Sequence, residues 1–389
     1  MRVLLEAGVN GLAVDNSGIT PLNVAALNGH MEVVKLLRPD PAEVEITEHY
    51  DEQWTARYET AWDQYQNVDS SILTMLPSTF KRQGKDWFAI FNRHVPKQLE
   101  FSLVSTCSVP GWGKSPVCFS ANGNYFASVM AGSIRIFDIT TEMEIASLFA
   151  NDAVGVGSVC FNRDGSKLAA GYVNGAIDLW NIATKKIEKK FFGHTQTVCT
   201  LDVSEHWVVS GSVDGSVRVW SMKSGGNLKT FKPPTSASHV TAVALCPNGK
   251  YVAAGSLHGW VGVWTMQGAV VLKKSKGHEG RVNCVVFSAT KNELISGATD
   301  KTVKVWKFSV SRKWFGGLFE IQSEETTFDK HKDRVTSVAA SEDGKWIMSG
   351  GVDKSVIFWN AIDGKAHFIL QVHEEKHPSP LYNRYLADL

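Results

Sequence analysis

Short apolar segments alternate with polar turns over the last two thirds of the chain, and the pattern repeats. Each unit holds an apolar segment, a polar turn, a second segment that ends near Ser-Gly or Ala-Gly, a tight turn, and a third segment that ends in an aromatic residue. Residues 282–287, 293–297 and 302–306 make up one such unit. Runs of this length and pattern, separated by turn residues, are typical of β-strands joined by hairpins. Each unit is therefore expected to form a small antiparallel sheet.

The aromatic residues that end the third segments reveal the period of the repeat. They are Phe137, Trp180, Trp220, Trp264, Trp306 and Trp359, at spacings of 43, 40, 44, 42 and 53 residues. A lone sheet of this size cannot cover its two apolar faces, so the six units must stack on one another. Stacking around an axis leaves only short strand edges exposed. The sequence therefore predicts a mainly β fold, a β-propeller with six recognisable repeats.

Two Gly-His pairs, Gly193-His194 and Gly277-His278, precede repeats that end in the aromatic strand. In this arrangement residues 99–371 resemble the WD-repeat family, whose signature is a Gly-His pair followed by a Trp-Asp pair. Only Asp138 keeps the final Asp of that signature. The resemblance implies a WD-repeat β-propeller for this part of the chain.

Three repeats carry His, Ser, Asp and Trp at matching positions. The sets are His194, Ser210, Asp214 and Trp220; His278, Ser296, Asp300 and Trp306; and His331, Ser349, Asp353 and Trp359. Ser, His and Asp are also the residues of a hydrolase triad, but an active site needs one set beside a cleft, whereas this set recurs with a Trp attached. We expect each set to be a buried hydrogen-bonded chain that holds a turn beside its strand. No enzymatic activity, metal or cofactor is predicted, although a propeller hydrolase stays open as an alternative.

The first 98 residues differ from the rest. In residues 1–40, Thr20-Pro21 begins a helix and Gly29 ends it, and a second helix follows, as in an ankyrin repeat, which the segment resembles. Residues 41–98 form a helical linker and pre-propeller segment, and residues 41–70 of it have a net charge of 1 − 8 = −7. The linker carries aromatic residues at helical spacing, which indicates either packing or a partner-docking helix. They are Trp54, Tyr58, Trp62 and Tyr65.

Charge and composition narrow the class of function. The chain has 389 residues, with 40 Lys and Arg against 39 Asp and Glu, so direct nucleic-acid binding through a basic field is not expected. No apolar stretch is long enough to span a membrane, and no signal peptide is recognised. The six cysteines show no paired spacing, which favours a reducing compartment, the nucleus or the cytoplasm.

Residues 81–104 resemble one particular group of WD-repeat proteins. They are similar to the segment before the propeller in fungal Tup-type general transcriptional corepressors, relatives of Groucho, as are residues 157–161 and 250–257 and the insertion between Lys307 and Asp329. The resemblance implies seven blades, a ring-closing strand at residues 99–105, and a nuclear location. A seventh aromatic strand and the oligomerising helix of that family are not found, and residues 372–389 are expected to be a tail.

These features predict a non-enzymatic scaffold that docks segments of transcription factors or regulatory adaptors. Recognition should lie in the loops between blades and in those inside each tight turn, which surround the central channel and are free to vary. The candidate partner-binding residues are Thr197, His239, Trp260, Arg281, Lys332 and Arg334. Two alternatives stay open: a cytosolic signalling or ubiquitin-ligase adaptor, and a truncated, nonfunctional gene product. The partners, the oligomeric state and the choice between six and seven blades are left open.

Overall fold

The described part of the chain consists almost wholly of β-strands. The computed structural model describes residues 58–59, 61–65, 73, 76, 81–83, 87–95, 117–130, 133–141, 143–149, 155–233, 239–268, 270–274, 277–312 and 319–372. The ankyrin-like residues 1–40, the expected strand at 99–105 and all but the first residue of the tail 372–389 lie outside this set. The chain divides into two compact units, residues 1–99 with 366–375, and residues 100–365 with 376–389.

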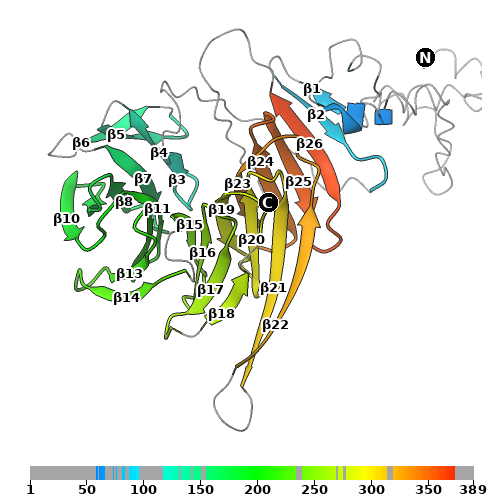
Figure 1. Ribbon diagram of the computed structural model, residues 1–389. Helices are drawn as coiled ribbons and strands as arrows, with labels where there is room; N and C mark the ends of the chain where they lie inside the picture. Colours follow the sequence, from blue (N-terminus) through cyan, green and yellow to red (C-terminus); the bar gives the residue numbers. More distant parts are fainter. Residues whose placement is uncertain are drawn as a thin grey trace, which may run out of the picture. The chain divides into compact units, whose positions relative to one another are not determined.

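The larger unit contains the repeated sheets that the sequence predicts (Figure 1). Five of them have four antiparallel strands paired in chain order, and three further strands, β23 to β25, follow the same order. The first two sheets are β3 (Val117–Phe119), β4 (Tyr125–Met130), β5 (Ser133–Asp138) and β6 (Glu144–Phe149), then β7 (Val156–Phe161), β8 (Lys167–Tyr172), β9 (Ile177–Asn181) and β10 (Lys186–Phe191).

The remaining strands of this unit continue the series. They are β11 (Val198–Val203), β12 (Trp207–Ser212), β13 (Val217–Ser221) and β14 (Asn227–Phe231); β15 (Val240–Leu245), β16 (Tyr251–Ser256), β17 (Val261–Thr265) and β18 (Val270–Lys274); β19 (Val282–Phe287), β20 (Glu293–Ala298), β21 (Val303–Arg312) and β22 (Phe319–Phe328); and β23 (Val335–Ala340), β24 (Trp346–Gly351) and β25 (Ser355–Asn360). The insertion after Lys307 is the extension of β21 and β22 into a long hairpin.

Each first strand from β7 onward begins with the same irregularity. Its register against the second strand shifts after one residue, as between Val198 and Thr200 or between Val282 and Cys284. Such a bulge bends the strand and increases its twist. Because the bulge recurs at the same position in β7, β11, β15, β19 and β23, the sheets share one curvature.

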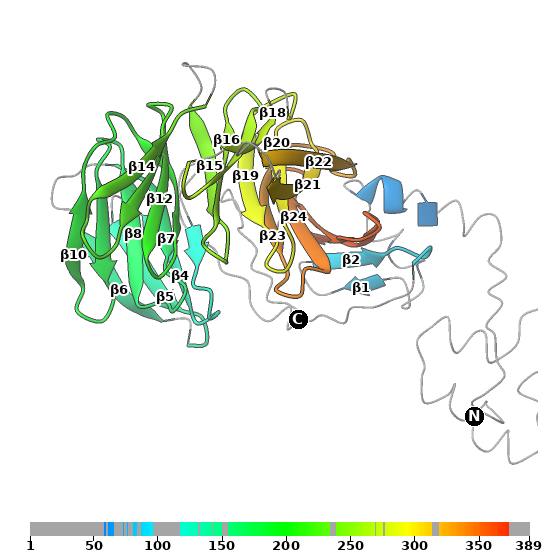
Figure 2. The same ribbon diagram turned by 90° about the horizontal axis from the view of Figure 1, so that it is seen from below.

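Consecutive sheets pack against each other in chain order, and their contact explains the recurring Ser-Gly and Ala-Gly pairs (Figure 2). Each of these glycines faces the first valine of the next first strand so closely that a Cβ atom would lie 2.4–2.6 Å from a valine Cγ1. The pairs are Gly171 with Val198, Gly211 with Val240, Gly255 with Val282, and Gly297 with Val335. The glycines are therefore needed for close approach between sheets.

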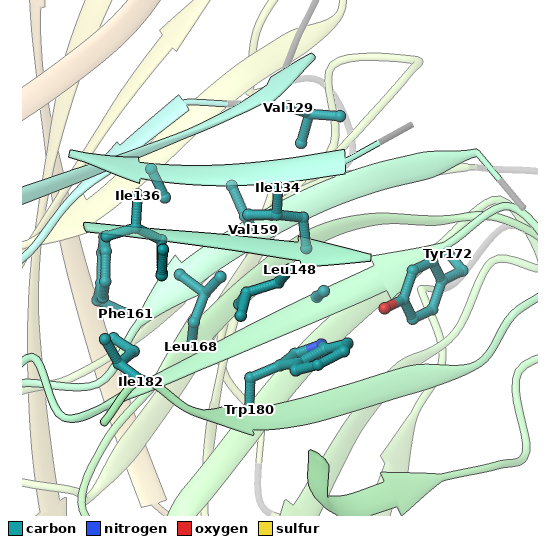
Figure 3. Close-up of a cluster of buried hydrophobic side chains, with 13 residues drawn as sticks. Val129, Ile134, Ile136, Leu148, Val159, Phe161, Leu168, Tyr172, Trp180 and Ile182 are labelled. Carbon is teal, nitrogen blue, oxygen red and sulfur yellow. The ribbon is translucent and has the colours of Figure 1, made fainter. Parts of the chain in front are cut away.

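Apolar side chains fill the space between neighbouring sheets. Figure 3 shows Ile134, Ile136 and Leu148 of the first sheet facing Val159 and Leu168 of the second, all of them buried. Burial of side chains of this size stabilises the fold by about 1.5–3 kcal/mol each. The core is thus a series of layers between sheets.

Polar side chains add directional bonds between the first strands. Thr241 Oγ1 donates a hydrogen bond to the carbonyl oxygen of Val282 at 2.5 Å, and Asn283 Nδ2 donates to that of Val335 at 2.6 Å. Asp202 accepts from the backbone N–H of Leu245 at 2.6 Å. These bonds fix the register of one sheet against the next.

The smaller unit holds three antiparallel strands, β1 (Lys81–Gln83), β2 (Trp87–Phe91) and β26 (Ala366–Val372). The upstream strand that pairs with β26 is thus residues 87–91, whereas we expected residues 99–105 to take that part. Phe91 and Phe368 lie 5.5 Å apart between ring centroids, and Phe88, Ala89 and Ile90 are buried, so this strand has the apolar side chains that its pairing needs.

The aromatic residues of the linker pack into the smaller unit. Tyr58, Trp62 and Tyr65 are buried, and the Tyr58 hydroxyl donates to the carbonyl oxygen of Phe91 at 2.7 Å. Arg93 lies over the Tyr58 ring and pairs with Glu59 at 2.9 Å. For these three aromatics the packing interpretation holds, while Trp54 lies outside the described residues.

The close contact between sheets gives a test. We expect Gly255→Ala to lower the free energy of unfolding by roughly 1–3 kcal/mol, because its Cβ would overlap Val282. Gly226→Ala is the matched control, because its Cβ would meet nothing closer than 3.5 Å. Urea denaturation measures both. In the double variant Gly255→Ala/Val282→Ala the loss should be smaller than the sum of the single losses, and strict additivity would contradict the contact.

Candidate functional site

A buried hydrogen-bonded chain lies at one end of the third sheet. The Trp220 indole Nε1–H donates to Ser210 Oγ at 2.8 Å, and Ser210 Oγ lies 2.7 Å from His194 Nε2. His194 Nδ1 lies 2.8 Å from Asp214 Oδ2. A neutral imidazole that accepts from Ser210 and donates to Asp214 satisfies every group in this chain.

The same chain occurs in the fifth and sixth sheets with nearly equal distances. The Trp–Ser, Ser–His and His–Asp distances are 2.8, 2.7 and 2.9 Å for Trp306, Ser296, His278 and Asp300, and again for Trp359, Ser349, His331 and Asp353. Each serine is at most 1% exposed. A serine buried in this way cannot reach a substrate. The hydrogen-bonded set therefore stabilises the structure, and its serine does not act as a nucleophile.

The electrostatics of the third-sheet chain favour a neutral histidine beside a charged carboxylate. Burial lowers the pKa of His194, and the hydrogen bond to Asp214 only partly opposes this effect. Burial raises the pKa of Asp214, but hydrogen bonds from Ser216 and His194 outweigh it and bring the value to about 2. In the fifth sheet the hydrogen bond and charge of His278 likewise hold the pKa of Asp300 well below its ordinary value, against the effect of burial.

The aspartate of each chain also fixes the loop before the first strand. Its Oδ2 accepts from the backbone N–H of the residue after the histidine, at 3.1 Å for Thr195, 3.0 Å for Glu279 and 2.8 Å for Lys332. The buried chain therefore sets the position of an exposed loop on the same sheet.

The second and fourth sheets fill this space differently. Trp180 has Ala170 in place of the serine, and the Tyr172 hydroxyl points toward its indole (Figure 3). Trp264 has Ala254 in that place, and its ring centroid lies 5.4 Å from that of Trp260. In these two sheets a second aromatic side chain of the same sheet lies beside the tryptophan, and the serine that bonds the indole is absent.

Trp260 corrects a prediction. We expected this residue among the partner contacts, but its ring is 3% exposed and lies against Trp264 and over Gly262, where an added Cβ would come within 2.3 Å of the indole. Trp260 belongs to the core, because it occupies the space that the histidine chain fills in other sheets.

The residue before each first strand is bonded to the turn between the second and third strands of its own sheet. In every case from the second sheet to the sixth, the backbone N–H of the turn residue donates to the carbonyl oxygen of the residue before the strand at 2.9–3.0 Å. The pairs are Val173 with Gly155, Val213 with Thr197, Leu257 with His239, Thr299 with Arg281, and Val352 with Arg334. Four predicted partner-binding residues therefore share one backbone position. We call the surface made of these five pairs and their adjoining loop residues the loop face.

The side chains of the loop face differ in exposure. His239, Lys332 and Arg334 are exposed, whereas Thr197 and Arg281 are half-buried. The Thr197 hydroxyl donates to the carbonyl oxygen of Val173, in the turn of the preceding sheet, at 3.3 Å. Arg281 Nε is buried without a hydrogen-bond partner among the described residues. Burial raises the pKa of Cys199, and the positive charge of Arg281 partly opposes this effect.

Sequence reasoning missed the turn residues of the loop face. Val173 and Val352 are 50% and 42% exposed, although valine in a strand pattern is usually buried. The repeated position two residues after the glycine-bearing pair of the second strand could have identified them. Within the described part of the chain, no cluster of metal-ligating side chains occurs and no helix is long and apolar enough to cross a membrane.

Comparison with known proteins agrees with this geometry. The WD domain, G-beta repeat, matches residues 185–221, 225–265, 270–307 and 322–360, and ankyrin repeats (many copies) match residues 1–38. Each WD match begins near the outer strand of one sheet and ends with the third strand of the next, as from β10 to β13. The matched unit therefore spans the contact between two sheets.

Three relatives show the range of proteins with similar chains. The transcriptional repressor rco-1 of Neurospora crassa is 35% identical over 327 residues, which are 79% of this chain and 52% of that protein. Periodic tryptophan protein 2 of Arabidopsis thaliana is 28% identical over 70% of this chain and 29% of its own length. A guanine nucleotide-binding protein subunit beta of Zea mays is 28% identical over 46% of this chain and 51% of its own length.

The fold class follows from the repeated sheets and the matched repeats together. The chain is a WD-repeat β-propeller protein with an ankyrin match at its N-terminal end. Such repeats, and relatives of this kind, support a role as a protein-interaction scaffold. The chain spans about half or less of the length of the three relatives described above.

The buried serine gives a test of the hydrogen-bonded chain. We expect Ser296→Ala to lower the free energy of unfolding by about 1–3 kcal/mol, because it leaves the Trp306 N–H and the His278 nitrogen without a partner. Ser288→Ala is the control, because Ser288 is equally buried but its hydroxyl makes no hydrogen bond. Equal losses in the two variants, measured by urea denaturation, would contradict the role of the chain.

Lowering the pH should reduce the free energy of unfolding in two pH ranges. The folded pKa of His194 lies below its unfolded value, so the unfolded state binds more protons as the pH falls through about 6.5, and stability falls. The folded pKa of Asp214 is about 2, against about 3.9 when unfolded, so the stability from its charge is present above pH ~4 and lost between ~4 and ~2. Denaturation midpoints measured from pH 7 to pH 2 should show both steps. Asp214→Asn should reduce the step between pH ~4 and ~2. If the midpoints of this variant depend on pH as those of the original chain do, the assignment of this step to Asp214 is wrong.

Proposed function

We propose that the protein is a non-enzymatic scaffold of the transcriptional corepressor kind, and that it docks short segments of regulatory proteins on its loop face. The observation that carries this proposal is the shared backbone position of Gly155, Thr197, His239, Arg281 and Arg334. One framework presents a glycine and four different side chains at the same position of consecutive sheets, which suits recognition of an extended segment.

The relatives support the corepressor part of the proposal. The transcriptional repressor rco-1 of Neurospora crassa matches 79% of this chain at 35% identity. A repressor works in the nucleus, so we propose a nuclear location and transcription factors or regulatory adaptors as partners. Because the net charge of the whole chain is +1, the contact with regulated genes would run through proteins rather than DNA.

The burial of the three repeated Ser-His-Asp sets supports a role without catalysis. The three repeated Ser-His-Asp sets of the described sheets have serines that are at most 1% exposed and already bonded to tryptophan. A triad needs a hydroxyl that a substrate can reach.

A signalling adaptor is the second candidate. The guanine nucleotide-binding protein subunit beta of Zea mays matches 46% of this chain at 28% identity. Both candidates use the propeller as a platform, so they differ in partner and compartment rather than in architecture. The transcriptional repressor matches a larger share of this chain than the subunit beta does, 79% against 46%, which favours the corepressor role.

A tethering experiment separates the candidates. The full chain, fused to a heterologous DNA-binding domain, should lower the output of a reporter gene, because a corepressor acts once it is brought to a promoter. Thr197→Glu/His239→Glu should relieve this repression, because both residues lie on the loop face.

The control variant is Lys229→Glu, an exposed change on the outer strand β14, which should leave repression intact. A fusion that is expressed and nuclear but does not repress would reject the corepressor role. Repression that survives Thr197→Glu/His239→Glu would reject the loop face.

A further inference from the structure

Charged side chains are distributed unevenly over the loop face. In the second to fourth sheets, the described loops and turns of this face carry Lys232 and the buried-chain residue Asp214 as their only charges. The fifth and sixth sheets carry six cations, Arg281, Lys301, Lys330, Lys332, Arg334 and Lys354. Their acids are Glu279, Asp329 and Asp333, together with Asp300 and Asp353.

Two of these acids do not offset the cations at the surface. Asp300 and Asp353 have side chains that are 11% and 0% exposed, and each is bonded to the histidine of its own buried chain. Without these two buried acids, the described loops and turns of the fifth and sixth sheets carry 6 cations − 3 acids = +3. Asp333 pairs with Arg334 at 3.6 Å, whereas Lys301 and Lys332 have no ion pair with any described carboxylate.

Two of the lysines occupy backbone positions that lysine does not favour. The turn position after Asn174, Asp214 and His258 is a glycine with φ of 85°, 77° and 77°. At the equivalent position of the fifth and sixth sheets stand Lys301 and Lys354, with φ of 70° and 63°. A side chain at positive φ is disfavoured by contact between its Cβ and the backbone. These two turns therefore present a charged side chain where the turns of the second to fourth sheets have glycine.

The packing of consecutive sheets sets the turn of one sheet beside the loop of the next. In the fourth sheet the carbonyl oxygen of the turn residue Gly259 accepts from the backbone N–H of His278, in the loop of the next sheet, at 2.9 Å. In the second sheet a Cβ on Gly175 would lie 2.4 Å from the carbonyl oxygen of His194, again in the next loop. The same relation between the fifth and sixth sheets would place Lys301 near the loop that holds His331 and Lys332.

The structure also holds this loop in place. The Lys332 backbone N–H donates to Asp353 at 2.8 Å, and Asp353 is bonded to His331 in the buried chain. Lys332 is thus a charge on a fixed support, which lowers the ordering cost of binding.

We propose that the loop face of the fifth and sixth sheets recognises a peptide segment rich in Asp and Glu, with Lys301 and Lys332 as its central contacts. This proposal rests on the proposed function, because it names the chemistry of the segment that the loop face would dock. The described loops and turns of the second to fourth sheets carry few charges and include the exposed Val173, so they would take the apolar part of the same segment.

A peptide selection tests the proposal. The full chain is immobilised and used to select from a random fifteen-residue phage-displayed library, and selected peptides are then synthesised and titrated by fluorescence anisotropy. The selected pool should be enriched in Asp and Glu, and affinity should fall steeply with added salt, because screening shortens the reach of exposed charges to about 8 Å at 0.15 M.

Charge reversal on the loop face provides the matched comparison. Lys301→Glu/Lys332→Glu should weaken binding of the selected peptides by about tenfold or more at low salt. Lys185→Glu/Lys186→Glu is the control, because Lys185 is also exposed and at positive φ, but lies in a turn at the opposite end of its sheet. This control variant should bind the selected peptides as tightly as the original chain does.

A glycine variant separates the charge from the fold. Lys301→Gly/Lys354→Gly removes two charges and relieves two disfavoured backbone positions, so its melting temperature should be unchanged or raised while peptide affinity falls. A lowered melting temperature with unchanged affinity would overturn the proposal, because the lysines would then serve the fold.

The outcomes distinguish this proposal from the one on which it rests. A selection that yields no binding peptide would reject peptide docking on the loop face altogether. A pool of binders without acidic enrichment, or acidic peptides that bind Lys301→Glu/Lys332→Glu as well as the original chain, would reject only the acidic chemistry. Tighter binding of a 20-base-pair DNA duplex than of the selected peptides would also overturn it.

Discussion

The close approach of consecutive sheets is the constraint on which the rest of the structure depends. A four-stranded sheet has two apolar faces and cannot bury them alone, so each sheet needs a neighbour. The neighbour comes so near that the second strand has room only for glycine where the next first valine packs, as at Gly255 and Val282. This contact also sets the turn of one sheet against the loop of the next, so core and surface are built together.

The buried hydrogen-bonded sets connect the core of a sheet to the loop at its surface. Trp306, Ser296 and His278 carry hydrogen bonds from the third strand of the fifth sheet to Asp300 in its turn, and Asp300 then holds the backbone of the loop that leads to Arg281. The fourth sheet has Ala254 in place of the serine, and Trp260 packs on Trp264. Two chemical solutions therefore support one backbone geometry.

The repeated framework leaves the exposed side chains free to differ. The backbone bond between the turn and the residue before the first strand recurs in five sheets, while the residue itself changes from Gly155 to Thr197, His239, Arg281 and Arg334. Because a backbone bond places no demand on the side chain, neighbouring sheets can present different charges at the same geometric position. This separation of scaffold from surface is what suits the fold to binding.

The sequence by itself determined the repeated sheets, the membership of the three hydrogen-bonded sets and the position of the residues before each first strand. These features depend on local spacing: strands alternate every two residues, turns need Gly, Asn or Asp, and a period near 42 residues marks each unit. Only the tertiary structure decided that Trp260 is core, that residues 87–91 pair with β26, and that Lys301 lies at positive φ. Each of these depends on which segments, distant in sequence, come into contact, and local pattern carries no information about the partner.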